Sequence, residues 1–176
     1  DMIEMIGPTI CGVKALGYKK IAIVATRATI RSGAYQRGLD VLGIGHYAVA
    51  APDLVPAIES GASSETIKKI IDDIVDTTIA NGCDALLLGC THFPLVRDLF
   101  EQSIKERKSD IAVIDPAEFV VKETLKRFDV SGNGTTRFVL SKDSVVFREK
   151  VSRCLGAPIE ALTESNGIVS FQIPRL

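Results

Sequence analysis

The chain has 176 residues and a formal net charge of −1, with 46% hydrophobic and 24% charged residues. These values are typical of a soluble globular protein, and a chain of this length buries roughly 70% of its unfolded surface on folding. Lysine and arginine form no basic stripe, no apolar run reaches the roughly 18 residues that span a bilayer, and no secretory signal is visible. We therefore expect a cytoplasmic protein with no nucleic-acid or membrane partner.

The first part of the chain alternates between predicted helices and strands. The run Lys20–Ala25 (KIAIVA) is continuous and β-branched, as expected of a strand that is buried on both faces. A clear helix is predicted at 65–80, with isoleucines at helical spacing and Asn81-Gly82 as its stop. The other predicted elements here are a helix at 6–16, a loop at 26–29, a helix at 32–42, a strand at 46–50 and a turn-rich segment at 51–64.

The second part of the chain continues the same alternation. It predicts strands at 85–88 and 111–114, a helix that begins at Pro94 and a helix at 116–127. The loop DVSGNGTT at 129–136 is the best candidate for a boundary, and beyond it we predict a strand at 137–140, a helix at 144–154 and a weak strand at 159–162. Repeated strand–helix units predict a three-layer α/β fold with a parallel sheet covered on both faces.

The four cysteines, Cys11, Cys83, Cys90 and Cys154, include no C-x-x-C pair. Neither a disulfide framework nor a zinc ribbon is indicated, and reduced thiols of a cytoplasm fit best. We expect Cys11, Cys83 and Cys154 to be buried and to act as small hydrophobic residues.

Cys90 differs because it lies in LLLGCTHFPL, directly after a predicted buried strand. Ligands gather at the carboxyl ends of parallel strands, where free backbone N–H groups at a helix start, such as that of Thr91, favour anions and thiolates. A nearby His92 would either favour the thiolate in the same way or relay a proton. A metal held by Cys83, Cys90 and His92 is the weaker interpretation, because their spacing matches no zinc pattern.

Each of four further polar residues has two interpretations. Thr26 and Thr29 follow the strand Lys20–Ala25, where their hydroxyls would either contact a ligand or cap a helix. Glu59 is an acid in an apolar stretch and would either hold a histidine or ammonium group or be solvated. His46 is expected to be a strand residue or a surface histidine.

LLLGCTHFPL strongly resembles the second cysteine motif of bacterial glutamate racemases. KIAIVATRATIRSGAY and PDLVPAIESG resemble two further segments of that family in the same order, and IDPAEFVVKETL and RFVLSKDSVVFREKV resemble its closing portion. The resemblance spans nearly the whole chain.

The resemblance implies an isomerase that interconverts L- and D-glutamate without a cofactor or metal, for peptidoglycan precursor synthesis. In this family, two cysteines on opposite faces of the substrate exchange the α-proton. By resemblance, Cys90 is one of these cysteines, Thr91 and His92 bind substrate or assist proton transfer, Glu59 orients His92, and Thr26 is a further substrate contact. The family also implies that two similar α/β domains form the site between them.

The chain departs from this pattern at the family's first half-site. No Cys-Asn-Thr or Asp-Ser-Gly segment occurs, and the chain begins with Asp1, so it resembles the carboxyl-terminal two-thirds of such an enzyme. The resemblance implies an α/β domain at 1–114 with the Cys-Thr-His half-site, and a segment at 115–176 that packs on a second, largely missing α/β domain. We expect the chain alone to be inactive as a racemase and to form a homodimer or bind the missing half.

Two alternatives remain open. The first is an amino-acid-binding, anion-binding or interaction protein that keeps the racemase fold without catalysis. The second is another enzyme of the superfamily, such as an aspartate racemase, decarboxylase or isomerase. A cysteine hydrolase is disfavoured, because no oriented His-Asp pair or separate oxyanion loop is apparent.

Overall fold

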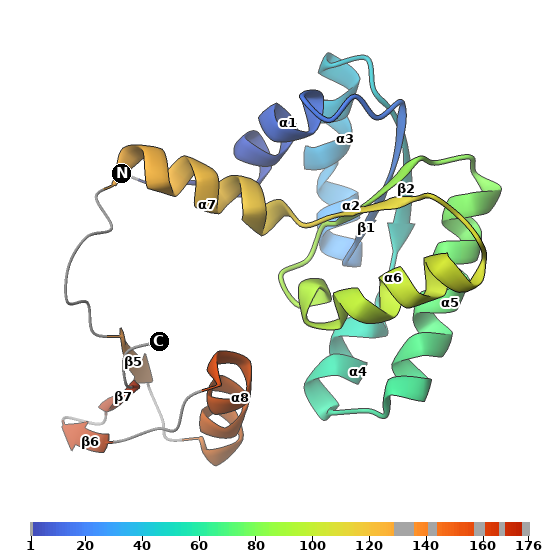
Figure 1. Ribbon diagram of the computed structural model, residues 1–176. Coiled ribbons are helices and arrows are strands. Elements are labelled where there is room, and N and C mark those ends of the chain that lie inside the picture. The colour runs from blue at the N-terminus through green and yellow to red at the C-terminus, as the bar shows by residue number, and fades with distance from the viewer. Residues whose placement is uncertain (1, 129–135, 141–143, 157–160, 166–167, 174–176) are drawn as a thin grey trace. The chain divides into compact units, whose positions relative to one another are not determined.

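The computed structural model describes residues 2–128, 136–140, 144–156, 161–165 and 168–173 (Figure 1). The chain forms two compact units, Asp1–Asp129 and Val130–Leu176. The division falls at the start of the Gly/Asn/Ser loop, so the first compact unit extends beyond residue 114. That residues 115–176 complete a further domain remains a prediction.

The first unit contains a four-stranded parallel sheet and the helices around it. Its strands are β1 (Lys20–Ala25), β2 (Gly45–Ala50), β3 (Ala85–Leu88) and β4 (Ala112–Ile114). Its helices are α1 (Ile6–Lys14), α2 (Arg27–Ser32), α3 (Ala34–Val41), α4 (Leu54–Ser60), α5 (Ser64–Ala80), the 3-10 helix η1 (Phe93–Val96), α6 (Arg97–Glu106) and α7 (Pro116–Arg127).

The strand order is β2-β1-β3-β4, and every neighbouring pair in it is parallel. Side chains alternate between the two faces of the sheet. Ile21 and Ile23 of β1 pack in one core with residues of α1, α3 and α7, whereas Val24 packs in a second core with residues of α4, α5, η1 and α6. These two cores confirm the predicted α/β sheet with helices on both faces.

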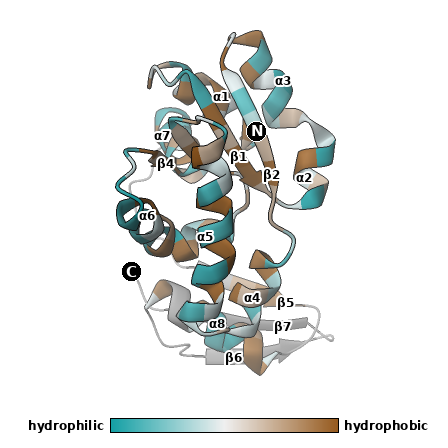
Figure 2. Cartoon of the chain, turned by 90° about the vertical axis from the view of Figure 1, so that its right-hand side faces the viewer, coloured by the Kyte–Doolittle hydropathy of each residue, from teal (hydrophilic) through white to brown (hydrophobic). Residues whose placement is uncertain are grey.

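The amphipathic helix α5 shows how the second core forms (Figure 2). Ile67, Ile71 and Val75 recur every four residues and are buried, which places them on the side that packs in this core. The side chain of Ser63 accepts a hydrogen bond from Thr66 N–H and caps the helix start.

Two predictions for the segments after β1 and β2 are wrong in detail. The turn-rich segment 51–64 contains the helix α4, because Pro56 lies in its first turn, where the missing N–H costs no helical hydrogen bond. The loop predicted at 26–29 is wrong, because residues 27–29 begin the helix α2. The helix predicted at 32–42 is present as α3, which is separated from α2 at Gly33 with a φ of 64°.

The second unit contains β5 (Thr136–Leu140), α8 (Val145–Leu155), β6 (Ala161–Ser165) and β7 (Ile168–Ile173). Its strands form an antiparallel sheet in the order β5-β7-β6, so the predicted parallel pattern is wrong here. β6 and β7 are separated by two residues, a spacing that permits a hairpin but no parallel crossover. Residues 159 and 160 of the predicted weak strand lie outside the described residues, as does the side chain of Cys154.

Candidate active site

The carboxyl ends of β1 and β3 lie side by side. Val24 pairs with Leu88, and Gly89 N–H donates to the carbonyl of Val24 at 2.7 Å. Thr26 and Cys90 therefore each follow the paired residues by two positions. A Cβ at position 89 would lie 3.1 Å from the Cβ of Ala25, so the close approach of the two strands favours glycine in this turn.

Cys90, His92 and Glu59 form a chain of polar contacts at this edge. The Sγ of Cys90 lies 4.0 Å from His92 Nδ1, and His92 Nε2 lies 2.9 Å from Glu59 Oε1 on α4. A proton on Nε2 that is donated to the Glu59 carboxylate leaves the Nδ1 lone pair facing the thiol. The predicted contact between Glu59 and His92 is present. The geometry suits proton transfer between a thiol and an imidazole.

A cavity of about 160 Å³ adjoins the thiol. Thr91 is exposed and lines this cavity together with Cys90, whereas His92 and Glu59 do not line it. The full lining is Met5, Tyr35, Leu88, Gly89, Cys90, Thr91, Pro94, Asp115, Pro116 and Ala117. The thiol thus has the imidazole as one neighbour and a small, largely apolar cavity as another.

Thr26 acts as a helix cap in this structure. Its hydroxyl oxygen accepts a hydrogen bond from Thr29 N–H at 3.2 Å, and the two threonine hydroxyls lie 3.0 Å apart. The capping reading is therefore confirmed. The predicted substrate contact of Thr26 stays a prediction.

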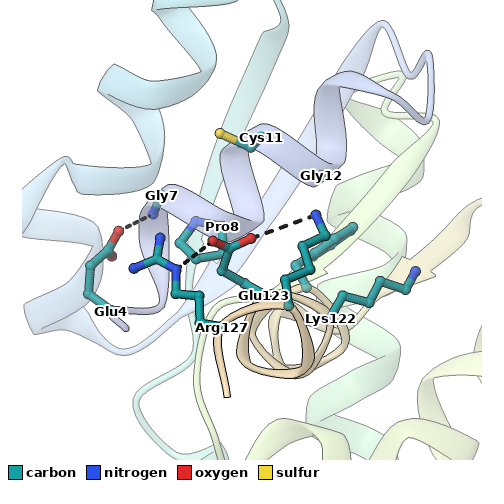
Figure 3. Close-up of a pocket in the computed structure, with 10 residues that line it drawn as sticks. Glu4, Gly7, Pro8, Cys11, Gly12, Lys122, Glu123 and Arg127 are labelled. Atoms are coloured by element: carbon teal, nitrogen blue, oxygen red, sulfur yellow. Dashed lines mark hydrogen bonds and ion pairs between the residues drawn. The ribbon is translucent and has the colours of Figure 1, made fainter. Parts of the chain in front are cut away.

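The remaining cysteines differ from Cys90. Cys83 precedes β3 and is 6% exposed, as predicted, and burial raises the pKa of its thiol. The prediction for Cys11 is wrong, because α1 buries Thr9 and Val13, four residues apart, and leaves Cys11 exposed between them. Cys11 lines a groove of about 430 Å³ between α1 and α7, and Figure 3 shows it directed away from Glu123.

Sequence reasoning missed several residues of the cavity, among them Met5, Tyr35 and Asp115. Asp115 accepts a hydrogen bond from Ala117 N–H at 2.9 Å and thereby caps α7. Burial raises the pKa of Tyr35 to about 12, so its phenol is neutral at physiological pH. An Asp directly before Pro116 signals a helix cap in the sequence, but nothing local to Tyr35 places it beside a thiol.

The described residues contain no group of three His, Cys, Asp or Glu side chains that could hold a metal ion. Cys83 and Cys90 lie at opposite ends of β3, so they cannot share one. Within the described part of the chain, no helix is both long and apolar enough to cross a bilayer.

The curated relatives that match this chain in sequence are glutamate racemases. The chain is 30% identical to the glutamate racemase of Desulforudis audaxviator over an alignment 180 positions long, which covers 93% of this chain and 65% of that protein. It is 36% identical to that of Koribacter versatilis over 117 residues, which cover 64% of this chain and 39% of that protein. The chain thus spans between about two-fifths and two-thirds of the length of these relatives.

Solved structures share the fold. Glutamate racemase of Francisella tularensis, in complex with D-glutamate, superimposes with a TM-score of 0.77 at 23% identity, covering 94% of this chain and 64% of that one. Glutamate racemase of Aquifex pyrophilus superimposes with a TM-score of 0.65 at 27% identity, covering 86% of this chain and 59% of that one. The fold and the site together define a parallel-sheet α/β protein of the racemase type.

The family model described as Asp/Glu/Hydantoin racemase matches residues 2–124, well over half of the chain. The chain belongs to this family.

Proposed function

We propose that the chain supplies one face of the active site of a glutamate racemase, with Cys90 as one of its two acid/base cysteines. The observation that carries this proposal is the contact chain from the Cys90 thiol through His92 to Glu59, next to a cavity at the carboxyl edge of the sheet. The glutamate racemases among its relatives, and the D-glutamate in the complex from Francisella tularensis, support glutamate as the substrate.

In the proposed reaction, the Cys90 thiolate removes the α-proton of glutamate. The Cα–H bond breaks, an S–H bond forms, and the electron pair is delocalised into the substrate carboxylate. Backbone N–H groups and the Thr91 and Thr26 hydroxyls would stabilise the developing charge, because donors fixed in advance need little rearrangement in the transition state. His92, held by Glu59, would accept the thiol proton and return it. No cofactor takes part.

Racemisation also needs an acid on the opposite face of the substrate. Among the cysteines whose side chains the structure describes, Cys90 alone lines the cavity. We therefore expect the chain by itself to exchange the α-proton of one enantiomer with solvent and to return it to the same face without inversion. Full turnover would need a second thiol that faces the substrate from the opposite side. The proposed product, D-glutamate, would serve peptidoglycan synthesis in the cytoplasm.

The test is the incorporation of deuterium at the α-carbon of L- and D-glutamate in D₂O, measured by NMR. The chain should exchange one enantiomer, and Cys90→Ala should slow that exchange by about 10²- to 10⁴-fold. Cys83→Ala, which removes a buried thiol at the other end of β3, is the matched control and should retain the exchange. Exchange that survives Cys90→Ala would contradict the proposal.

A second candidate is a glutamate-binding protein without turnover, which the single thiol at the described cavity favours. Calorimetry would identify it by glutamate binding in a chain that exchanges no α-proton. This result would also contradict the racemase proposal.

A further inference from the structure

Arg97 is the first residue of α6, which follows directly on η1. Its guanidinium donates hydrogen bonds to three different residues. Nε donates to Glu101 at 2.7 Å, Nη1 donates to Glu118 at 2.8 Å, and Nη2 donates to the carbonyl of Val113 at 3.3 Å. The bond to Glu101 stays within α6, whereas the other two reach α7 and β4. One side chain therefore links three elements of the fold.

The bonds of Arg97 pass around the edge of the parallel sheet. In the part of the chain that the structure describes, β4 is the last strand of the order β2-β1-β3-β4. An edge strand presents backbone carbonyls that no further strand pairs with, and Arg97 donates to one of them. α6 packs in the core on one face of the sheet, whereas Phe119 of α7 packs in the core on the other face. The Arg97–Glu118 bond thus joins the two helical layers around β4.

The same two layers form walls of the cavity beside Cys90. Pro94 of η1 lines this cavity from the layer of α6, and Ala117 lines it from the start of α7. Pro94 lies three residues before Arg97, and Ala117 directly precedes Glu118. The ion pair between Arg97 and Glu118 therefore connects the two chain segments that carry these walls.

The expected consequence of this ion pair is local. The side chains of Arg97 and Glu118 are 35% and 54% exposed, and exposed ion pairs contribute little to global stability. Hydrogen bonds to Glu101 and to Glu118 raise the pKa of the guanidinium, so it stays charged whenever thiols are alkylated. A contact that is weak for the whole fold still opposes a local opening, because such an opening breaks few other contacts. Loss of the pair should separate the two walls without unfolding the chain.

We propose that Arg97 is a positioning residue for the cavity at Cys90: its bond to Glu118 holds two walls of the cavity together and so limits the cavity's width. The inference rests on the proposed function only in taking Cys90 as the reacting thiol. Its test measures the access of reagents to that thiol, which needs no substrate and no acid on the opposite face. A chain that exchanges no α-proton of glutamate therefore still tests the role of Arg97.

The experiment compares the alkylation of Cys90 by two uncharged maleimides of different size, N-ethylmaleimide and N-pyrenylmaleimide, resolved by mass spectrometry. Both reagents add to the same thiolate, so the ratio of their rates reports access to the cavity and cancels changes in thiolate reactivity. Arg97→Gln removes the ion pair, and the rate of the pyrenyl reagent relative to the ethyl reagent should rise about threefold or more. Glu118→Gln breaks the same bond from the other side and should give the same rise.

Two matched variants separate positioning from a general effect of charge. Glu101→Gln removes the other carboxylate that binds Arg97, but this bond stays within α6, so the ratio should not change. Arg107 directly follows the other end of α6 and also binds two carboxylates, those of Asp72 and Asp76. Arg107→Gln should therefore leave the ratio unchanged as well.

The buried Cys83 reports general loosening of the fold and should stay slow toward both reagents in every variant. An unchanged or lower ratio at Cys90 in Arg97→Gln would overturn the proposal. An equal rise in Glu101→Gln would also overturn it, as would equal acceleration of Cys83 and Cys90 in Arg97→Gln.

Discussion

The amino and carboxyl edges of the same parallel sheet use their polar groups differently. At the amino edge, the Asp84 carboxylate accepts the backbone N–H groups of Lys19 and Lys20 at 2.8 and 3.0 Å, and the neighbouring Cys83 is buried. At the carboxyl edge, Cys90 is half-buried and lies 4.0 Å from an imidazole. The amino edge joins strands, whereas the carboxyl edge leaves a thiol, an imidazole and hydroxyls accessible.

The first prediction has the largest expected effect on stability and concerns the amino edge of the sheet. Asp84→Ala removes a charged acceptor from two backbone N–H groups and should lower the free energy of unfolding by about 2–3 kcal/mol. Urea denaturation measures this loss, with the exposed Asp110→Ala as control. The alkylation rate of Cys90 should not change. If Asp84→Ala lowers the free energy of unfolding no more than Asp110→Ala does, the Asp84 carboxylate does not stabilise the amino edge.

The second prediction concerns the carboxyl edge. Glu59→Gln keeps the shape of the side chain but removes the charge that orients His92, so α-proton exchange should slow on the order of tenfold. Because Glu59 is half-exposed, we expect a smaller effect than in a buried triad. Glu65→Gln changes an acid that is 82% exposed on α5 and should leave the exchange rate intact. Equal rates of α-proton exchange in Glu59→Gln and the wild type would show that Glu59 has no role in the reaction.

A smaller effect is expected at Thr26, which lies at the carboxyl edge but acts as a cap. Thr26→Val should destabilise the chain by about 1 kcal/mol, and Thr26→Ser should restore most of that loss. Thermal unfolding of the two variants gives the comparison. If valine is as stable as threonine here, the hydroxyl does not serve as the cap, and the ligand-contact reading of Thr26 is favoured.

The smallest effect concerns the ion pairs of α5 with Arg107, the residue after α6. The Arg107 guanidinium bonds to Asp76 and holds the pKa of that carboxyl below its usual range. A lowered folded-state pKa means that this stabilisation is present above the unfolded value of about 3.9 and is lost as the pH falls through the folded value. The urea midpoint should therefore fall on acidification below about pH 4. Arg107→Gln should make this fall shallower. If the urea midpoint of Arg107→Gln depends on pH as that of the wild type does, the Arg107–Asp76 ion pair is not its cause.

The sequence predicts the strands of the first unit well because their signal is local. β1 and β3 are continuous apolar runs, each followed by a polar or glycine residue, and their predicted bounds agree with the structure. α7 is bounded by Pro116 at its start and is also placed correctly. α4 is missed because proline and glycine resemble a loop until the proline is seen to lie in a first helical turn.

The candidate site is predictable only in part, for the same reason. Cys90, His92 and Glu59 stand out as polar residues within apolar stretches, and two of them lie in one motif. Tyr35 gives no such signal, because its place beside the cavity depends on packing near Gly89, which is distant in the sequence. The exposure of Cys11 likewise depends on which side of α1 faces the sheet.

The most direct test of the central claim, that the Cys90 thiol lies at an open glutamate site, is the alkylation rate of each cysteine in the wild-type chain with and without L- or D-glutamate. Cys90 should react faster than Cys83, and glutamate should slow Cys90 while leaving Cys11 unchanged. If Cys90 reacts no faster than Cys83, or if neither enantiomer protects it, the central claim is contradicted.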